Sequence, residues 1–254
     1  MWSEPLFSLL GWSVDLYVIF IVSGALVALE CSLFLGWERG IPSRLILALW
    51  AVGVVGMIVG GVFVPKWFQN FLPNQGHWSL SMLAAILLSK VLLISVLSAW
   101  RPRLPELLDI GAPGMALGQS IGRLGCFAAG CCYGTPAPGL PWAVTFQGGS
   151  SAERYPNVPV HPFQLYEALG CLFIALLLFK LRHLPVPEGT WVLVYLVSFG
   201  TLRFFIEFFR GDPRPMVGIL SLNQIICLGF IAVAIFILTR LVSKTTKQHI
   251  VQYS

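Results

Sequence analysis

Long apolar runs alternate along this chain with short segments rich in glycine, proline and charged residues. Each run approaches the ~20 residues that an α-helix needs to cross ~30 Å of hydrocarbon. The pattern predicts an all-α membrane protein with about seven transmembrane helices, forming one domain over residues 1–254. We place the spans near 14–36, 44–65, 79–98, 107–128, 162–182, 189–210 and 217–240.

The composition supports a lipid environment. Of the residues, 57% are hydrophobic and 11% are charged, whereas roughly a quarter are charged in an average soluble domain. The net charge of +5 could suggest a nucleic-acid partner, but the basic residues are scattered between the apolar runs and form no stripe. We therefore expect the membrane bilayer, and no nucleic acid, as a partner.

The basic residues predict the direction of the chain across the membrane. With seven spans, one set of loops and the C-terminal tail carry most of them: Arg39, Arg44, Arg101, Arg103, Lys180, Arg182, Arg240, Lys244 and Lys247. The opposite side carries Lys66, Arg154 and Arg214. By the positive-inside rule the N-terminus lies outside and the C-terminus is cytoplasmic. A long outer loop, 129–161, then joins helices four and five, and alternation over Trp142 to Phe146 suggests a short strand in it.

The fourth span is too polar to face lipid on every side, so we expect it to line an interior. Its polar residues and prolines are Asp109, Pro113, Gln119, Ser120 and Arg123. Glycines recur in it every four residues, at Gly114, Gly118 and Gly122. This spacing lets a second helix approach closely.

Charged residues within a membrane are costly unless paired, so they are candidates for function. Arg203, Glu207 and Arg210 recur at i, i+4 and i+7, which would place them on one helix face near the outer end. Glu207 could simply pair with both arginines and hold helices together. Two arginines still exceed one carboxylate, and Arg123 adds a third at a similar depth. Such a surplus of guanidinium groups suits a phosphate.

The fifth span begins with a polar edge formed by His161, Gln164 and Glu167, roughly one turn apart. His161 could be catalytic or could only cap the helix. We expect no cofactor and no metal, because the four histidines, His77, His161, His183 and His249, are far apart in the chain.

Three runs of residues resemble, in order, the signature segments of the prolipoprotein diacylglyceryl transferase family. The first is Gly122-Arg123-Leu124-Gly125-Cys126-Phe127, followed by Gly130, Gly134 and Leu140-Pro141-Trp142-Ala143-Val144. The second is His161-Pro162-Phe163-Gln164-Leu165-Tyr166-Glu167, and the third runs from Arg203 to Arg210. Together they span roughly half of the chain.

The resemblance implies an enzyme of the bacterial cytoplasmic (inner) membrane with its active site toward the outer side. It would transfer the diacylglyceryl group of phosphatidylglycerol to the lipobox cysteine in the signal peptide of a prolipoprotein, releasing glycerol phosphate. Cations around the phosphate would stabilise the departing charge. The thiol would need a base or a positive field to become a thiolate.

The resemblance also implies roles for particular residues. Arg123 and Arg203 would hold the lipid phosphate, and Glu207 and Arg210 would order their helix face. The substrate-binding set is completed by Tyr17, Gln164, Glu167 and Gly134. Tyr17 could equally be an aromatic anchor at the outer interface. The catalytic set comprises Arg123, Arg203, Glu207, His161 and His77.

The sequence departs from the family at two places. The usual His-Gly-Gly run at the start of span three is replaced by Trp78-Ser79-Leu80-Ser81-Met82, with His77 as a displaced substitute. One residue turns a helical side chain by about 100°, so His77 need not occupy the same place. At Cys126 and near Cys131, the family's signature segment usually has an asparagine and an acidic residue.

These departures leave two alternatives open: an enzyme of the same fold with another acceptor, or a lipid-binding or transport protein without chemistry. A transporter needs a polar path on both sides. The intramembrane charges instead cluster outward, apart from Asp109 and Lys90.

The cysteines fall into two groups. Cys31, Cys171 and Cys227 lie in apolar runs, where a thiol packs well. Cys131 and Cys132 are adjacent, so a bond between them would be strained. Packing of these thiols, or a bond to Cys126, is equally consistent with the sequence.

Overall fold

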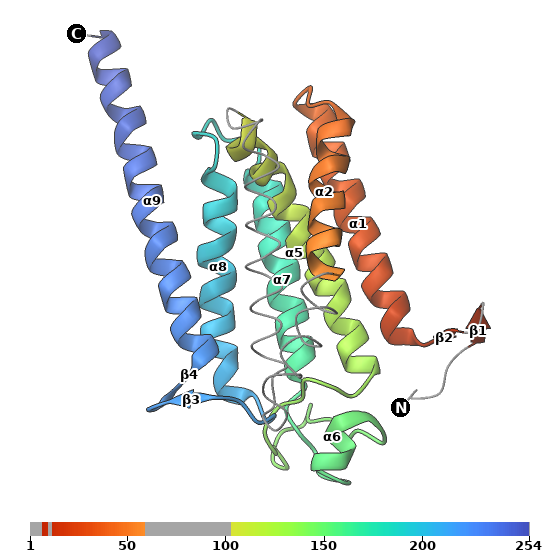
Figure 1. Ribbon diagram of the computed structural model, residues 1–254. Coiled ribbons are helices and arrows are strands. Elements are labelled where there is room, and N and C mark those ends of the chain that lie inside the picture. Colours follow the sequence, from red (N-terminus) through yellow and green to blue (C-terminus); the bar gives the residue numbers. More distant parts are fainter. Residues whose placement is uncertain (1–6, 10–11, 59–102, 254) are drawn as a thin grey trace, which may run out of the picture. The chain divides into compact units, whose positions relative to one another are not determined.

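The computed structural model describes residues 7–9, 12–58 and 103–253 (Figure 1). The chain divides into two compact units, Met1–Cys31 with Leu108–Ser254, and Ser32–Leu107. The third expected span, 79–98, and His77 lie outside the described residues. The site described below belongs entirely to the first unit.

Six long helices account for six of the seven expected spans. They are α1 (Leu16–Glu38), α2 (Ser43–Ile58), α5 (Leu104–Ala128), α7 (Phe163–Leu181), α8 (Thr190–Ile206) and α9 (Leu222–Tyr253). Among the described residues, four segments are long and apolar enough to cross a membrane: Leu16–Glu38, Phe163–Leu181, Thr190–Phe209 and Leu222–Ser243. The helical class and the membrane character are thus confirmed, whereas the seven-span topology stays a prediction.

The remaining described elements are short. The strands β1 (Phe7–Leu9) and β2 (Trp12–Val14) pair antiparallel, with Phe7 opposite Val14. The helix α6 (Gly149–Arg154) lies within the 129–161 loop, and the 3-10 turn η3 (Glu207–Phe209) follows α8. The strands β3 (Met216–Val217) and β4 (Leu220–Ser221) form a second antiparallel pair, with Met216 opposite Ser221.

One expected helix boundary and one expected strand were wrong. Residues 217–221 are not helical, because the chain turns at Gly218, with φ of +64°, into the hairpin of β3 and β4, and the last helix begins only at Leu222. The first helix begins at Leu16, because Val14 pairs in β2. No strand forms over Trp142 to Phe146, since Val144 alone in that stretch is paired, in an isolated bridge with Val160.

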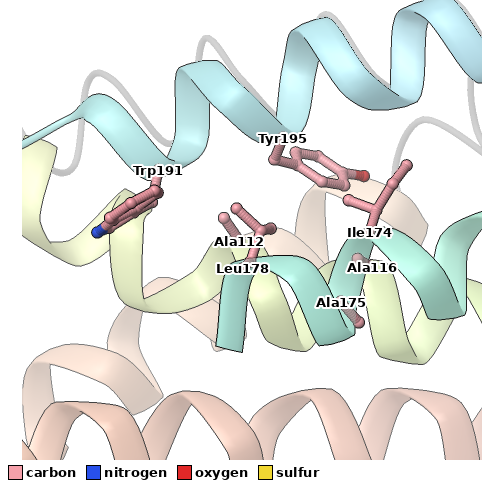
Figure 2. Packing of buried hydrophobic residues seen from close by; sticks show 7 residues of the cluster. All are labelled: Ala112, Ala116, Ile174, Ala175, Leu178, Trp191 and Tyr195. Carbon is pink, nitrogen blue, oxygen red and sulfur yellow. The ribbon is translucent and has the colours of Figure 1, made fainter. Parts of the chain in front are cut away.

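Small side chains let α5, α7 and α8 pack closely in the first unit. Their shared core consists of Ala112, Ala116, Ile174, Ala175, Leu178, Trp191 and Tyr195 (Figure 2). Two polar residues of α5 are satisfied within this packing, as Ser120 Oγ donates to the Ala168 carbonyl at 2.8 Å and Gln119 Oε1 accepts from Tyr195 at 2.8 Å. The fourth expected span therefore lines an interior, as predicted.

The glycine stripe of α5 faces α1. A Cβ added to Gly118 would lie 2.7 Å from the Gly24 carbonyl oxygen and 2.9 Å from Ala28 Cβ. A Cβ on Gly122 would lie 3.4 Å from Ile21 Cδ1. The expected close helix contact is therefore present at these two glycines, and it holds the C-terminal half of α5 against α1.

Candidate functional site

Arg123, near the C-terminal end of α5, and Arg203, in the last turn of α8, both approach one carboxylate on α7. Arg123 Nη2 lies 2.9 Å from Glu167 Oε1, and Arg203 Nε lies 3.7 Å from the same oxygen. The Glu167 side chain is 2% exposed, so water cannot substitute for these partners. Arg123 and Arg203, the two arginines expected to hold a lipid phosphate, thus converge on Glu167.

Glu207 is a second centre of ion pairing. Arg203 Nη1 lies 2.8 Å from its Oε2, and Arg214 Nη1 lies 3.3 Å from its Oε1. Ser221 and Asn223 donate side-chain hydrogen bonds to Oε1 at 3.2 and 3.1 Å. Glu207 therefore ties the end of α8 to the hairpin and to the start of α9.

Arg210 does not lie on the helix face with Arg203 and Glu207, so this expectation was wrong. The α-helix ends at Ile206, and the turn η3 leaves Arg210 in extended backbone, with φ of −82° and ψ of 133°. Arg210 pairs instead with both oxygens of Asp212, at 2.5 and 2.9 Å. Burial opposes the charged guanidinium, but hydrogen bonding and the charge of Asp212 outweigh it and raise the pKa of Arg210.

The ring of Phe163 contacts both Arg203 and Arg210. The guanidinium carbons of Arg203 and Arg210 each lie 5.2 Å from the centroid of its ring, and the ring is fully buried. An aromatic face attracts cations at this range. Phe163 therefore holds the two guanidinium groups near each other without neutralising either.

We call this cluster the arginine site, and it carries more positive than negative groups. Its members are Arg123, Arg203, Arg210, Arg214, Glu167, Glu207 and Asp212. Four guanidinium groups face three carboxylates, so the cluster can accept an anion. Three buried oxygens in the cluster or at its edge have no hydrogen-bond partner among the described residues: Gln164 Oε1, Glu167 Oε2 and Glu207 Oε2. Of these, Glu207 Oε2 is ion-paired with Arg203.

Gly134 packs against two other chain segments beside the arginine site, at His161 and at Phe209–Arg210. It forms an isolated bridge with Arg210, and its amide donates to the His161 carbonyl at 3.1 Å. A Cβ there would lie 2.5 Å from His161 Cβ and 2.9 Å from the Phe209 carbonyl oxygen. Gly134 therefore permits close backbone packing, while Gln164 Nε2 anchors the neighbouring loop by donating to the Cys131 carbonyl at 2.6 Å.

His161 precedes α7 and contacts an aromatic group. Its Nδ1 lies 3.1 Å from the Tyr166 hydroxyl, which also accepts from Trp142 Nε1 at 2.8 Å. Its ring centroid is 5.1 Å from that of Phe209. Gln164 and Glu167 are buried on α7, whereas His161 is half-buried and precedes the helix. The expected polar edge of the helix therefore includes Gln164 and Glu167 but not His161.

Tyr17 lies in the first turn of α1 against the C-terminal end of α5. A Cβ on Gly125 would lie 3.1 Å from the Tyr17 carbonyl oxygen. The Tyr17 side chain is 39% exposed. This position brings Tyr17 to the same end of the helices as Arg123, and its role stays a prediction.

Five members or partners of this cluster were not predicted from the sequence: Phe163, Asp212, Arg214, Ser221 and Asn223. Phe163 lies within the family-like run at 161–167, but an apolar residue at the start of a span gives no sign of contacting two arginines. Arg214 was treated only as a loop charge. Its ion pair with Glu207 depends on the chain reversing after η3.

Membrane-length apolar helices around a buried cluster with excess guanidinium groups define a membrane protein suited to an anionic ligand. The model of the prolipoprotein diacylglyceryl transferase family matches residues 4–240. The chain therefore belongs to this family.

Named relatives agree with this assignment. The phosphatidylglycerol–prolipoprotein diacylglyceryl transferase of Clostridium tetani is 30% identical over 240 residues, covering 91% of this chain and 95% of its own. The protein of the same name from Finegoldia magna is 28% identical over 240 residues, covering 91% and 92%. That of Geobacter sulfurreducens is 33% identical over 179 residues, covering 66% and 65%.

Proposed function

We propose that this protein transfers the diacylglyceryl group of phosphatidylglycerol to the thiol of a lipobox cysteine in a prolipoprotein. The cysteine sulfur bonds to the glyceryl carbon as the bond from that carbon to the phosphate oxygen breaks. Glycerol phosphate leaves, and the thiol proton passes to a base. Family membership and the names of the relatives support this reaction.

The convergence of Arg123 and Arg203 on Glu167 is the observation that carries the proposal. A lipid phosphate can share these guanidinium groups because each has several N–H donors and Glu167 Oε1 engages only part of them. As the phosphate ester leaves, its charge grows, and prearranged cations stabilise it most at that stage. Glu207 holds Arg203 in place from the other side.

The unpartnered acceptors beside the arginines suit the headgroup of phosphatidylglycerol. Gln164 Oε1 and Glu167 Oε2 are buried and accept no hydrogen bond from the described residues. The headgroup glycerol carries hydroxyl groups that can donate to them, which would remove the cost of burying these oxygens. In this arrangement Gln164 and Glu167 bind the substrate, as the family resemblance implied.

His161 is our candidate for the base. A hydrogen bond donated from Nδ1 to the Tyr166 hydroxyl would leave Nε2 free to accept the proton of the acceptor thiol. His77 stays a second candidate from outside the described residues.

The proposal includes the orientation of the protein in the bacterial inner membrane. The basic loop charges favour an outer N-terminus and a cytoplasmic C-terminus, which would place the arginine site toward the outer leaflet. A fluorescent protein fused after Ser254 should then fluoresce, and alkaline phosphatase fused there should be inactive. The reverse pair of results would contradict this orientation.

A transfer assay tests the reaction directly. Purified protein is mixed with phosphatidylglycerol vesicles and a prolipoprotein substrate, and lipid addition is followed by a mobility shift and by mass spectrometry. We expect transfer by the parent protein, and a loss of about 100-fold or more in Arg123→Ala and Arg203→Ala, since each removes charge stabilisation from the departing phosphate.

Arg154→Ala is the matched control, because Arg154 is an exposed residue of α6 outside the arginine site. It should retain parental activity. Full activity in either site variant would refute the phosphate arrangement. Binding of phosphatidylglycerol by the parent protein without any transfer would favour a lipid-binding protein instead.

A further inference from the structure

Three cysteine thiols converge beside the arginine site. Cys126 lies in the last turn of α5, and Cys131 and Cys132 follow in the connection after it. Their sulfur atoms all lie within 4.8 Å of one another, and none of the three forms a disulfide. We call Cys126, Cys131 and Cys132 the thiol cluster.

The backbone around the thiol cluster is held in an unusual conformation. Cys132 has φ of +55° and Gly130 has φ of +63°, both in the left-handed region. A side chain at positive φ is unfavourable, and residues held there despite the cost often belong to functional sites. The Cys131 amide donates to the Cys126 carbonyl at 3.1 Å, and Gln164 fixes the Cys131 carbonyl from α7. The fold thus holds the three thiols together.

A cation stabilises negative charge on the cluster. Arg123 Nη1 lies 3.8 Å from Cys126 Sγ as a hydrogen-bond donor, while Nη2 of the same side chain contacts Glu167. A nearby guanidinium group favours the thiolate form of cysteine, which is the form that binds metals. Cys126 is buried and the other two thiols are half-buried, so the cluster is shielded yet reachable.

We infer that Cys126, Cys131 and Cys132 bind one thiophilic d10 metal ion, Zn²⁺ or Cu⁺, through their three sulfur atoms. Thiolate ligands select such ions. With metal–sulfur distances of about 2.3 Å, three sulfur ligands lie about 4 Å apart, which agrees with the 4.8 Å limit on the separations of these sulfur atoms. Each thiol releases its proton to solvent on binding, and the metal keeps its oxidation state.

A metal accounts for the geometry better than a disulfide does. A disulfide would use two sulfurs and leave the third unpaired, and a bond between the adjacent Cys131 and Cys132 would be strained. A metal ion uses all three thiols at once. This inference does not depend on the proposed transfer reaction.

The test uses the full-length protein, reduced and handled without oxygen in detergent micelles. Zn²⁺ is titrated in competition with a chromophoric zinc chelator, and Cu⁺ in competition with a cuprous chelator. We expect one equivalent of at least one of these ions to bind tightly. Failure of both ions to bind the fully reduced parent protein would overturn the inference.

Alkylation locates the bound ion without any substitution. The bound ion should slow labelling of Cys126, Cys131 and Cys132 by a maleimide about 10-fold or more, as measured by peptide mass spectrometry. Cys227, which lies in α9 outside the cluster, should be labelled at an unchanged rate. Equal protection of Cys227, or no protection of the cluster, would contradict a site at these three thiols.

Single substitutions then test the ligand set. Cys126→Ser, Cys131→Ser and Cys132→Ser should each weaken binding by more than the 10–100-fold typical for loss of an outer-shell partner, and Cys227→Ala should bind like the parent. A disulfide between two cluster cysteines in protein trapped directly from membranes, with no metal bound, would overturn the inference and identify a redox pair instead.

Discussion

The two ends of α5 bury charge in opposite ways. Near its start, Asp109 is 3% exposed, and its two oxygens accept backbone hydrogen bonds from Gly189 at 2.7 Å and Val192 at 2.8 Å. Near its end, Arg123 enters the arginine site, where guanidinium groups outnumber carboxylates. The charge of Asp109 stabilises the start of α8, whereas the charge of Arg123 belongs to a cluster that can bind an additional anion.

The difference follows from what satisfies each group. The first amides of α8 have no partner within their own helix, and the helix dipole favours a negative group there. Asp109 therefore completes the fold and needs no ligand. In the arginine site, Gln164 Oε1 and Glu167 Oε2 lack donors among the described residues. A buried charge is thus a sign of function only when nearby buried polar atoms lack hydrogen-bond partners.

The largest effect should come from Glu167→Gln, which keeps the shape of the side chain and removes its charge. Arg123 and Arg203 would then repel each other around a neutral group, and breaking a buried pair costs about 3–5 kcal/mol. We expect the thermal midpoint in detergent to fall by about 10 °C, and diacylglyceryl transfer to be lost. Parental stability would show that Glu167 is not needed to hold the arginines.

Gly118→Leu should have the next largest effect, because it acts on the packing that supports both ends of α5. Its side chain would collide with the backbone of Gly24, where even a Cβ has only 2.7 Å. Overpacking of this kind costs about 1–3 kcal/mol. Gly111→Ala is the control, since an added Cβ there meets nothing within 4 Å. Equal thermal midpoints for the two variants would refute the close contact between α1 and α5.

Asp109→Asn tests whether the charge at the start of α5 serves stability alone. It removes the charge and one of the two acceptor oxygens at the start of α8, which should cost about 1–2 kcal/mol. Transfer per folded molecule should remain close to that of the parent protein. A large fall in kcat with an unchanged thermal midpoint would show that Asp109 also takes part in function.

Tyr166→Phe should have the smallest effect on stability, about 1 kcal/mol, because it removes one hydroxyl that contacts His161 and Trp142. If His161 is the base, loss of this contact should lower kcat by about 10-fold and leave KM nearly unchanged. Trp142→Phe, which removes the other hydrogen bond to that hydroxyl, is the matched comparison. Equal kcat values for the parent and Tyr166→Phe would remove support for His161 as an oriented base.

Several features of the site could be predicted because they depend on local patterns. Charges inside apolar runs pointed to Arg123, Arg203 and Glu207, and the structure brings these residues together. The position of Arg210 could not be predicted, because the α-helix gives way to a 3-10 turn after Ile206 and Arg210 then pairs with Gly134, which is far away in the chain. The partners Asp212 and Arg214 depend on the same change of direction.

The sequence alone determined the class of the protein, the approximate helices and the family, because apolar length, periodicity and short runs of residues are properties of neighbouring positions. Tertiary structure decided which charges pair, that Asp109 caps α8, and that three thiols gather beside Arg123. These outcomes require contacts between residues far apart in the chain. Their geometry depends on how the helices pack, and small residues such as Gly118 set how closely they can approach.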